Sequence, residues 1–372
     1  MRIAVLRETA PAEARVALVP DVVQRLTKAG HRIAVQRGAG LAAGFVDAEY
    51  EKAGAQLHEA RSQALSGVDL WPRVRRPTGA ELGEAPEGTT VVSMLGVDPP
   101  DGLLPGLAAR GLTFLALERV PRITRAQSMD VLSSQATVAG YKAVLLGAAE
   151  LGKMLPMLTT AAGTLAPARV LVLGAGVAGL QAIATARRLG AVVSGFDVRP
   201  AAAEQVLSLG ATFVGPKVAA DAEAAGGYAR AQTAEEQAAT REALAAAIPQ
   251  NDLLVCTAQV PGRRAPVLVD AKALSTLRPG SVVVDLAAET GGNAEGTRAG
   301  ERVVVGGVVI LGPVQLAATV PLHASQMFAR NVLTLVQHLS TKEGALKIDP
   351  QDEITRAMLV TLNGQPAGGT GP

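Results

Sequence analysis

An apolar run that leads straight into closely spaced glycines constrains this chain more than any other feature. Residues 170–173 are all apolar, and Gly174, Gly176 and Gly179 follow them, ahead of a segment with apolar side chains at helical spacing. A strand, a glycine turn and a helix in this order are typical of dinucleotide-binding folds, because the turn aims free backbone N–H groups at a pyrophosphate. We therefore predict a dinucleotide site made by Gly174, Ala175, Gly176, Val177 and Gly179. A glycine-rich turn without a ligand is the alternative.

An acidic residue stands at the end of the next apolar run. Asp197 follows Gly179 by 18 residues, where a carboxylate accepts a hydrogen bond from the adenosine ribose of NAD. The same carboxylate would repel the 2′-phosphate of NADP, so Asp197 favours NAD. Arg199 is able to pair with that phosphate, which keeps NADP as the alternative. We expect Asp197, Val198 and Arg199 to line the cofactor site.

Composition narrows the classes of protein to which the chain can belong. The 372 residues suffice for two domains, and the net charge of +2 comes from dispersed Lys and Arg, which gives no indication of nucleic-acid binding. The single cysteine, Cys256, excludes an internal disulfide and provides no metal cluster, so we expect no metal and a reducing cytoplasm. The N-terminal residues have no signal-peptide pattern.

One uncharged segment is long enough to cross a bilayer. It runs from Val303 to Leu322, but glycines and prolines divide it into short β-branched pieces. We therefore predict buried parallel strands here, with a membrane span as the alternative.

Short apolar runs alternate with helical patterns along most of the chain, which predicts parallel sheets. The expected fold is α/β, with two doubly wound, Rossmann-like domains and a cleft between them. A helix from about 131 to 151 links the domains, and a final helix, at about 324–339, returns to the first one. The expected boundaries are 1–134 with 325–362 for the first domain, 135–324 for the dinucleotide domain and 363–372 for a flexible tail.

An insertion between Pro216 and Pro249 is longer than a strand-to-strand connection requires. Gly226 and Gly227 precede Tyr228 in it, which suggests a hinged flap whose ring closes over a ligand. An exposed surface loop is the alternative.

Polar residues are concentrated in residues 118–142, after the last strand expected in the first domain. Ligands bind at such strand ends in open α/β sheets, and Arg122, Arg125 and Gln127 are candidates for contact. A helix-capping network is the alternative for this group, which comprises Arg122, Arg125, Gln127, Asp130 and Ser133. For Asp130, just before a helix, the two interpretations have equal weight.

These features together resemble the soluble NAD(H)-binding component of the proton-translocating NAD(P) transhydrogenases, and also the alanine dehydrogenases that share its fold. The resemblance covers residues 1 to about 340, and its most specific stretches are 15–20, 121–130, 174–180, 196–199, 227–229 and 285–293. It implies that Arg122, Gln127, Asp130 and Ser133 surround the nicotinamide and that Tyr228 is the flap residue. Further cofactor contacts are expected from Thr257, Ala258, Val260, Pro261, Glu289 and Asn293.

The alanine dehydrogenases need an arginine and a lysine for the substrate carboxylate, a nearby acid and a catalytic histidine. Arg15 is present, Arg75 replaces the lysine and Glu289 provides an acid, but no histidine occurs in residues 91–95. General acid–base catalysis is worth roughly a hundredfold or more, so this loss argues against amino-acid turnover. An alanine-dehydrogenase-like oxidoreductase and a non-enzymatic NAD-binding regulator remain the alternatives.

The transhydrogenase resemblance implies hydride transfer between NAD(H) on this chain and NADP(H) on a partner subunit. It also implies a membrane-spanning subunit, a homodimer of this chain, and a location at the cytoplasmic face of the cell membrane. We expect no transmembrane segment in this chain itself.

Overall fold

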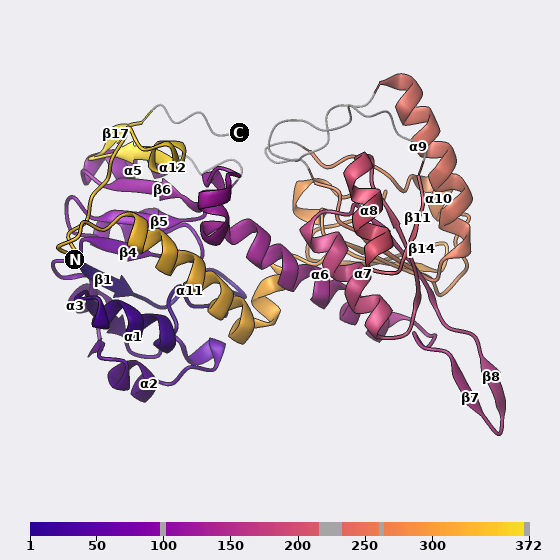
Figure 1. Cartoon of the computed structure of the whole chain (residues 1–372), viewed down its shortest axis with the longest axis horizontal. Helices are drawn as coiled ribbons and strands as arrows, with labels where there is room; N and C mark the ends of the chain where they lie inside the picture. The colour runs from indigo at the N-terminus through magenta and orange to yellow at the C-terminus, as the bar shows by residue number, and fades with distance from the viewer. Residues whose placement is uncertain (97–101, 216–232, 260–263, 368–372) are drawn as a thin grey trace. The chain divides into compact units, whose positions relative to one another are not determined.

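The computed structural model describes residues 1–96, 102–215, 233–259 and 264–367. Contacts divide the chain into two compact units, shown in Figure 1. The first unit comprises residues 1–135 and 318–372, and the second unit comprises residues 136–317. The helix α6 (Val131–Glu150) contains the first boundary between them.

The first unit is built on an eight-stranded sheet with the order β17-β16-β6-β5-β4-β1-β2-β3. Strands β1 to β6 are parallel, and β16 joins β6 in the antiparallel direction. The strands are β1 (Arg2–Val5), β2 (Arg32–Gln36), β3 (Gln56–His58), β4 (Leu70–Pro72), β5 (Thr90–Ser93), β6 (Thr113–Ala116), β16 (Leu359–Leu362) and β17 (Gln365–Pro366).

Helices connect these strands, as the alternating sequence pattern predicts. They are α1 (Pro20–Lys28), α2 (Asp47–Lys52), α3 (Arg61–Leu65), α4 (Gly79–Glu84), α5 (Leu103–Ala109), α11 (Pro321–His338) and α12 (Glu353–Met358). Three short 3-10 helices, η1 (Leu41–Ala43), η2 (Leu117–Arg119) and η3 (Thr124–Met129), lie in the connections.

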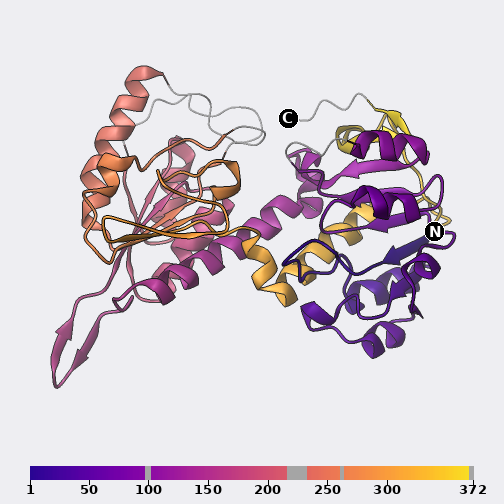
Figure 2. The ribbon, with the colours of Figure 1, turned by 180° about the vertical axis from the view of Figure 1, so that it is seen from behind.

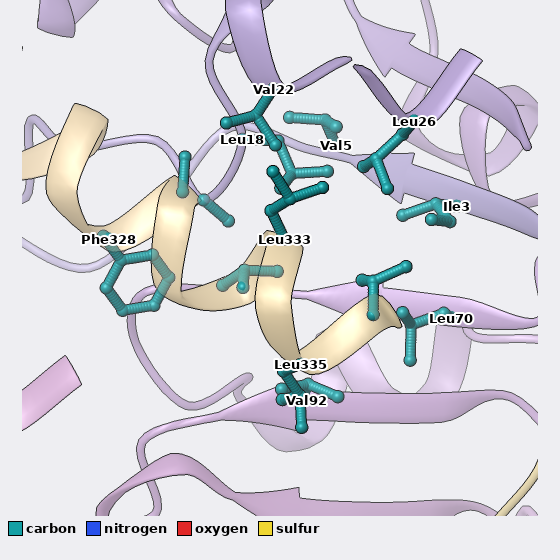
Figure 3. Close-up of a cluster of buried hydrophobic side chains, with 14 of the residues drawn as sticks. Ile3, Val5, Leu18, Val22, Leu26, Leu70, Val92, Phe328, Leu333 and Leu335 are labelled. Atoms are coloured by element: carbon teal, nitrogen blue, oxygen red, sulfur yellow. The ribbon is translucent and has the colours of Figure 1, made fainter. Parts of the chain in front are cut away.

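The final long helix, α11, packs on the sheet of the first unit, as expected. Its buried face carries Phe328 and Leu335, which lie in one core with Ile3 and Leu70 of strands β1 and β4 (Figure 3). Burying each such side chain stabilises the fold by about 1.5–3 kcal/mol. This core therefore ties the C-terminal segment to strands formed more than 200 residues earlier.

Figure 2 shows the second unit from behind. This unit is built on a seven-stranded sheet with the order β11-β10-β9-β12-β13-β15-β14. The strands are β9 (Arg169–Leu173), β10 (Val192–Phe196), β11 (Thr212–Phe213), β12 (Leu253–Cys256), β13 (Val282–Asp285), β14 (Arg302–Val305) and β15 (Val308–Leu311). All neighbours are parallel except β14 and β15. From β9 the chain passes to β10 on one side and later returns to β12 on the other side. Because β10 and β12 are both parallel to β9, the carboxyl ends of the three strands lie at one edge of the sheet.

The helices of the second unit are α7 (Val177–Arg188), α8 (Pro200–Ser208), α9 (Ala234–Ala247) and α10 (Ala271–Leu274), with the 3-10 helices η5 (Ile248–Gln250) and η6 (Ala288–Thr290). Another 3-10 helix, η7 (Leu316–Thr319), precedes α11. Helix α6 crosses α7 at very short distance. At Gly140, an added Cβ would lie 2.0 Å from the carbonyl oxygen of Ala178. Only glycine permits this crossing.

The uncharged segment 303–322 differs in part from the expectation of buried parallel strands. Strand β15 is parallel to β13, but β14 pairs antiparallel with β15 at the edge of the sheet, where Val304 is 53% exposed. Gly306 and Gly307 have φ angles of 58° and 83°, which a tight two-residue hairpin turn requires. Within the described ranges, no helix combines the length and the apolar character that crossing a membrane would need.

The C-terminal residues 363–367 also differ from the expected flexible tail. Asn363 and Gly364 have φ angles of 48° and 78°, and they turn β16 into β17. The Asn363 N–H donates to Thr113 Oγ1 at 3.0 Å, and the Ala367 N–H donates to the Val360 carbonyl. Asn-Gly between two strands is a strong hairpin signal, so the sequence contained the information. Residues 368–372 lie outside the described ranges.

A two-stranded arm extends from the second unit between α6 and β9 (Figure 1). Its strands are β7 (Leu158–Thr160) and β8 (Gly163–Leu165), and every residue in both is exposed. Leu158 pairs with Leu165 across the arm. An isolated hairpin of this kind is only marginally stable in water, so the exposed arm is an unusual feature of the unit.

Candidate functional site

The first and third glycines of the glycine turn are required by packing within the second unit. Gly174, which directly follows β9, has a φ of 97°, and a Cβ there would lie 2.7 Å from Thr257 Oγ1. A Cβ on Gly179 would lie 1.8 Å from the Gly174 carbonyl oxygen. These two residues therefore let α7 begin directly above the end of β9.

The middle glycine has no such explanation in the fold. Gly176 is the N-cap of α7 and has an extended backbone, with φ −76° and ψ −167°, that any residue can adopt. A Cβ at this position would meet no heavy atom within 4 Å. The open space beside the Gly176 backbone is what close approach of a pyrophosphate at a helix N-terminus requires. The turn therefore fits a dinucleotide by a feature that packing alone does not demand.

Asp197, at the end of β10, is bonded to the glycine turn. Its Oδ2 accepts a hydrogen bond from the Ala175 N–H at 2.8 Å, and its carboxylate pairs with the Arg199 guanidinium at 2.9 Å from Nε and from Nη2. Burial raises the pKa of Asp197, but the hydrogen bonds and charge of Arg199 outweigh this and hold the pKa below its usual value. The arginine that was the candidate for an NADP phosphate is therefore engaged with the carboxylate that favours NAD.

Thr257 and Asn293 shape the neighbouring loop after β12. Thr257 Oγ1 donates to the Gly174 carbonyl at 2.9 Å, which braces the glycine turn. The Asn293 side chain accepts from the Ala258 N–H at 3.0 Å and donates to the carbonyls of Ala258 and Pro266 at 2.8 and 2.7 Å. Because both amide protons of Asn293 are used in this way, its side chain holds the loop in place. Ala258 and Thr257 thus lie next to the glycine turn.

Asp285, at the end of β13, organises the segment that carries Glu289 and Asn293. Its fully buried carboxylate accepts hydrogen bonds from the N–H groups of Ala287, Asn293 and Ala294 and from Thr297 Oγ1, at 2.7–2.9 Å. Glu289 itself is exposed in η6. Asp285 was not among the predicted site residues, although an acid that ends the apolar run 282–284 was the available signal.

In the first unit, the polar segment forms η3 and the start of α6. Asp130 caps that helix, because its Oδ1 accepts from the Ser133 N–H at 2.9 Å and its Oδ2 accepts from Ser133 Oγ at 2.6 Å. Asp130 therefore caps the N-terminus of α6. The side chains of Arg122 and Gln127 are exposed.

The arginine that an alanine dehydrogenase would use for its substrate is already neutralised. Arg15 is buried, and its guanidinium donates two hydrogen bonds to the Glu13 carboxylate, from Nε at 2.7 Å and from Nη2 at 2.6 Å, and a third to Gln135 Oε1 at 2.8 Å. Ser93 occupies the end of β5, in the run where the catalytic histidine would be expected, and is fully buried. The backbone N–H of Arg75 donates to Glu8 at 3.3 Å.

Three of the predicted site residues lie outside the described residues. These are Tyr228, Val260 and Pro261.

Two family models together match most of the chain. Residues 4–139 match the family model described as "Alanine dehydrogenase/PNT, N-terminal domain", and residues 143–367 match "Alanine dehydrogenase/PNT, C-terminal domain". The chain belongs to the alanine dehydrogenase/PNT family. The resemblance drawn from the motifs is thereby confirmed.

Within the alanine dehydrogenase/PNT family, the chain is more similar in sequence to the transhydrogenases described below than to the alanine dehydrogenase. It is 43% identical to a protein of Rhodospirillum rubrum that is named as one portion of NAD(P) transhydrogenase subunit alpha, with 98% of this chain and 97% of that protein covered. The structure of a transhydrogenase from Sinorhizobium meliloti aligns with a TM-score of 0.88 at 42% identity, covering 98% of this chain and all of that one. An L-alanine dehydrogenase aligns with a TM-score of 0.82 at 27% identity, covering 98% and 96%. The expected Rossmann-like α/β class is confirmed.

Proposed function

We propose that this chain is the NAD(H)-binding component of a proton-translocating transhydrogenase. The observation that carries the proposal is Gly176, whose missing Cβ leaves open space at the N-terminus of α7. The Asp197–Ala175 hydrogen bond supports the choice of NAD(H), because it places a carboxylate beside that turn. Similarity to proteins named as transhydrogenase alpha subunits supports the reaction.

The cofactor supplies the chemistry, which is transfer of a hydride to or from the nicotinamide ring of NADP(H) on a partner protein. This chain needs to hold its own nicotinamide in the correct orientation, and orientation of this kind is worth several kcal/mol. Gln127 places the nicotinamide ribose, Arg122 and Asp130 hold each other and the ring, and Ser133 lies next to the carboxamide. Tyr228 closes the site against water. No side chain has to transfer a proton at the reacting carbons.

The proposed partners are an NADP-binding subunit and a membrane-spanning subunit, with this chain peripheral on the cytoplasmic face of the cell membrane. The name of the Rhodospirillum protein, which designates it as only a portion of a subunit, supports a complex of several chains. We also propose a homodimer. The exposed β7–β8 arm supports it, since Met157 and Leu165 present 64% and 56% of their surface to solvent.

An alanine-dehydrogenase activity is the second candidate, on the ground of the shared fold. The Arg15–Glu13 pair argues against it, because a substrate carboxylate would have to displace a buried glutamate that makes two hydrogen bonds.

One assay separates the candidates. The chain loaded with NADH is mixed either with an NADP⁺-loaded partner component or with pyruvate and ammonia, and NADH oxidation is followed in a single turnover. We expect oxidation only in the first mixture. The Gln127→Asn variant should slow that transfer while it leaves the NADH dissociation constant within about twofold. Oxidation by pyruvate and ammonia, or a wild-type chain that transfers no hydride to the partner, would overturn the proposal.

A further inference from the structure

The loop that carries Gln127 is anchored on both sides of that residue. Ala126 and Met129 are buried in the core of the first unit, whereas Gln127 between them is exposed. The loop therefore presents Gln127, together with the exposed Ser128, from a backbone that the two buried residues hold in place. Such support matters because a displacement of about 1 Å at a reacting centre can reduce a rate by as much as 10²-fold.

A side chain of α11 holds the peptide that follows Gln127. Asn331 Nδ2 donates a hydrogen bond to the Ser128 carbonyl at 2.8 Å. Asn331 lies within α11, where Asn is a poorer helix former than Ala or Leu. Its Oδ1 is buried and has no hydrogen-bond partner among the described residues. An unsatisfied buried acceptor is destabilising, so the favourable contribution of the amide at this position is the bond from Nδ2 to the Ser128 carbonyl.

The residue two positions before Gln127 is held from α12. Arg125 Nη2 lies 3.1 Å from Glu353 Oε2, and Arg125 Nη1 lies 3.4 Å from Asp352 Oδ1. These are exposed pairs that contribute little to stability by themselves. They nevertheless limit where the loop backbone can lie. Arg125 precedes Gln127 in the chain, whereas Ser128, which Asn331 contacts, follows it.

We propose that Asn331 is a positioning residue for Gln127. Its amide fixes the Ser128 carbonyl, and through that peptide it sets the direction in which the Gln127 side chain projects. The inference rests on the proposed role of Gln127 at the nicotinamide ribose.

The test uses Asn331→Asp, which keeps the shape of the side chain and removes the donor. We measure hydrogen exchange of peptides covering 124–129, the NADH dissociation constant, and single-turnover hydride transfer to an NADP⁺-loaded partner. We expect faster exchange in that loop, transfer slowed about tenfold, and NADH affinity within about twofold of wild type. In a Gln127→Asn background, the same substitution should slow transfer less than about twofold, because coupled residues are not additive.

Two controls accompany this variant. Gln337→Glu makes the same amide-to-carboxylate change at an exposed position of α11 and should alter none of the three measurements. Asn331→Ala also removes the donor, and alanine is the best helix former. If Asn331→Asp does not fold, Asn331→Ala is measured in its place.

Different results would refute the two proposals. Unchanged exchange in 124–129, or an equal slowing of transfer in both backgrounds, would overturn the role of Asn331. Faster exchange in a chain whose wild type transfers no hydride would support the positioning contact and refute the proposed function instead.

Discussion

The backbone N–H of Ala175 donates a 2.8 Å hydrogen bond to Asp197 Oδ2, which joins the glycine turn after β9 to the end of β10. The same carboxylate holds the Arg199 guanidinium. Asp197 therefore braces the turn and also neutralises Arg199, the cation that would favour NADP. Its substitution should change the choice of dinucleotide as well as the affinity.

Asp197→Asn should lower the affinity for NADH by about tenfold and raise that for NADPH. The neutral amide neither repels a 2′-phosphate nor engages Arg199 as an ion pair, so the guanidinium becomes available to the phosphate. We expect the ratio of the two dissociation constants, measured by fluorescence titration, to change by on the order of 10², equivalent to about 2.8 kcal/mol. Equal weakening of both dinucleotides would show that Asp197 only supports the turn.

Gly176→Ala should bind NADH at least about tenfold more weakly and unfold at nearly the wild-type temperature, because the added methyl group enters space that the protein leaves open. Gly179→Ala provides the contrast. Its methyl group would overlap the Gly174 carbonyl oxygen, so the variant should lose several kcal/mol of stability or fail to fold. Thermal unfolding and NADH titration of both variants check this. Unimpaired NADH binding by Gly176→Ala would contradict the proposed path of the pyrophosphate.

A buried ion-pair network in the first unit should make stability depend on acid pH. Arg73 Nη1 lies 2.7 Å from Glu81 Oε2, and Arg61 Nη1 lies 2.6 Å from Glu81 Oε1. Burial raises the pKa of Glu81, but these arginines and the Thr78 N–H outweigh it and bring the pKa to about 2, from 4.5. A carboxyl with a depressed pKa stabilises the fold above pH 4.5, and this contribution is lost as the pH falls toward 2.

Glu81→Gln should therefore lower the free energy of unfolding at pH 7 by about 3 kcal/mol. The difference from wild type should shrink as the pH falls from 4.5 to about 2. Denaturant titrations at several pH values measure it. Glu84→Gln, on the same helix and 46% exposed, is the control and should change stability by less than about 1 kcal/mol. A pH-independent difference between Glu81→Gln and wild type would contradict the assignment.

Leu165→Glu, at the arm, should weaken self-association of the chain and leave its unfolding temperature at low concentration unchanged. The expected cause is a charge placed where the arm buries apolar surface against a second copy. Thr164→Glu puts the same charge at the adjacent exposed position of β8, whose side chain points to the other face, and should have the smaller effect. Light scattering over a range of concentrations distinguishes the two variants. A monomeric wild type would rule out the homodimer.

Much of the second unit could be predicted because its signals are local. The apolar run 170–173, the glycines after it and Asp197 lie within one βα unit, whose geometry follows from short-range periodicity and backbone freedom. The hairpin at Asn363–Gly364 was equally local, and we missed it because a tail rich in glycine and proline favours disorder by composition.

The partners of the polar side chains could not be predicted in this way. Asn293 bonds to Ala258, Arg73 to Glu81 through Glu81 Oε2, and Asn331 to the Ser128 carbonyl. Each pair joins different elements, and no spacing along the chain relates one residue to the other. Sequence alone could not show that the Asn293 amide bonds to the backbone of Ala258 and Pro266.

The amino-acid sequence by itself determined the alternation of strands and helices, the glycine turn and the family, because these depend on neighbours in the chain. The tertiary structure decided which charges neutralise each other and which side chains stay exposed. It showed that Arg61 is paired with Glu81 and that Asn331 holds the Ser128 carbonyl. Those outcomes depend on distances between segments that the fold brings together, and hydrogen bonds and ion pairs act only over such short distances.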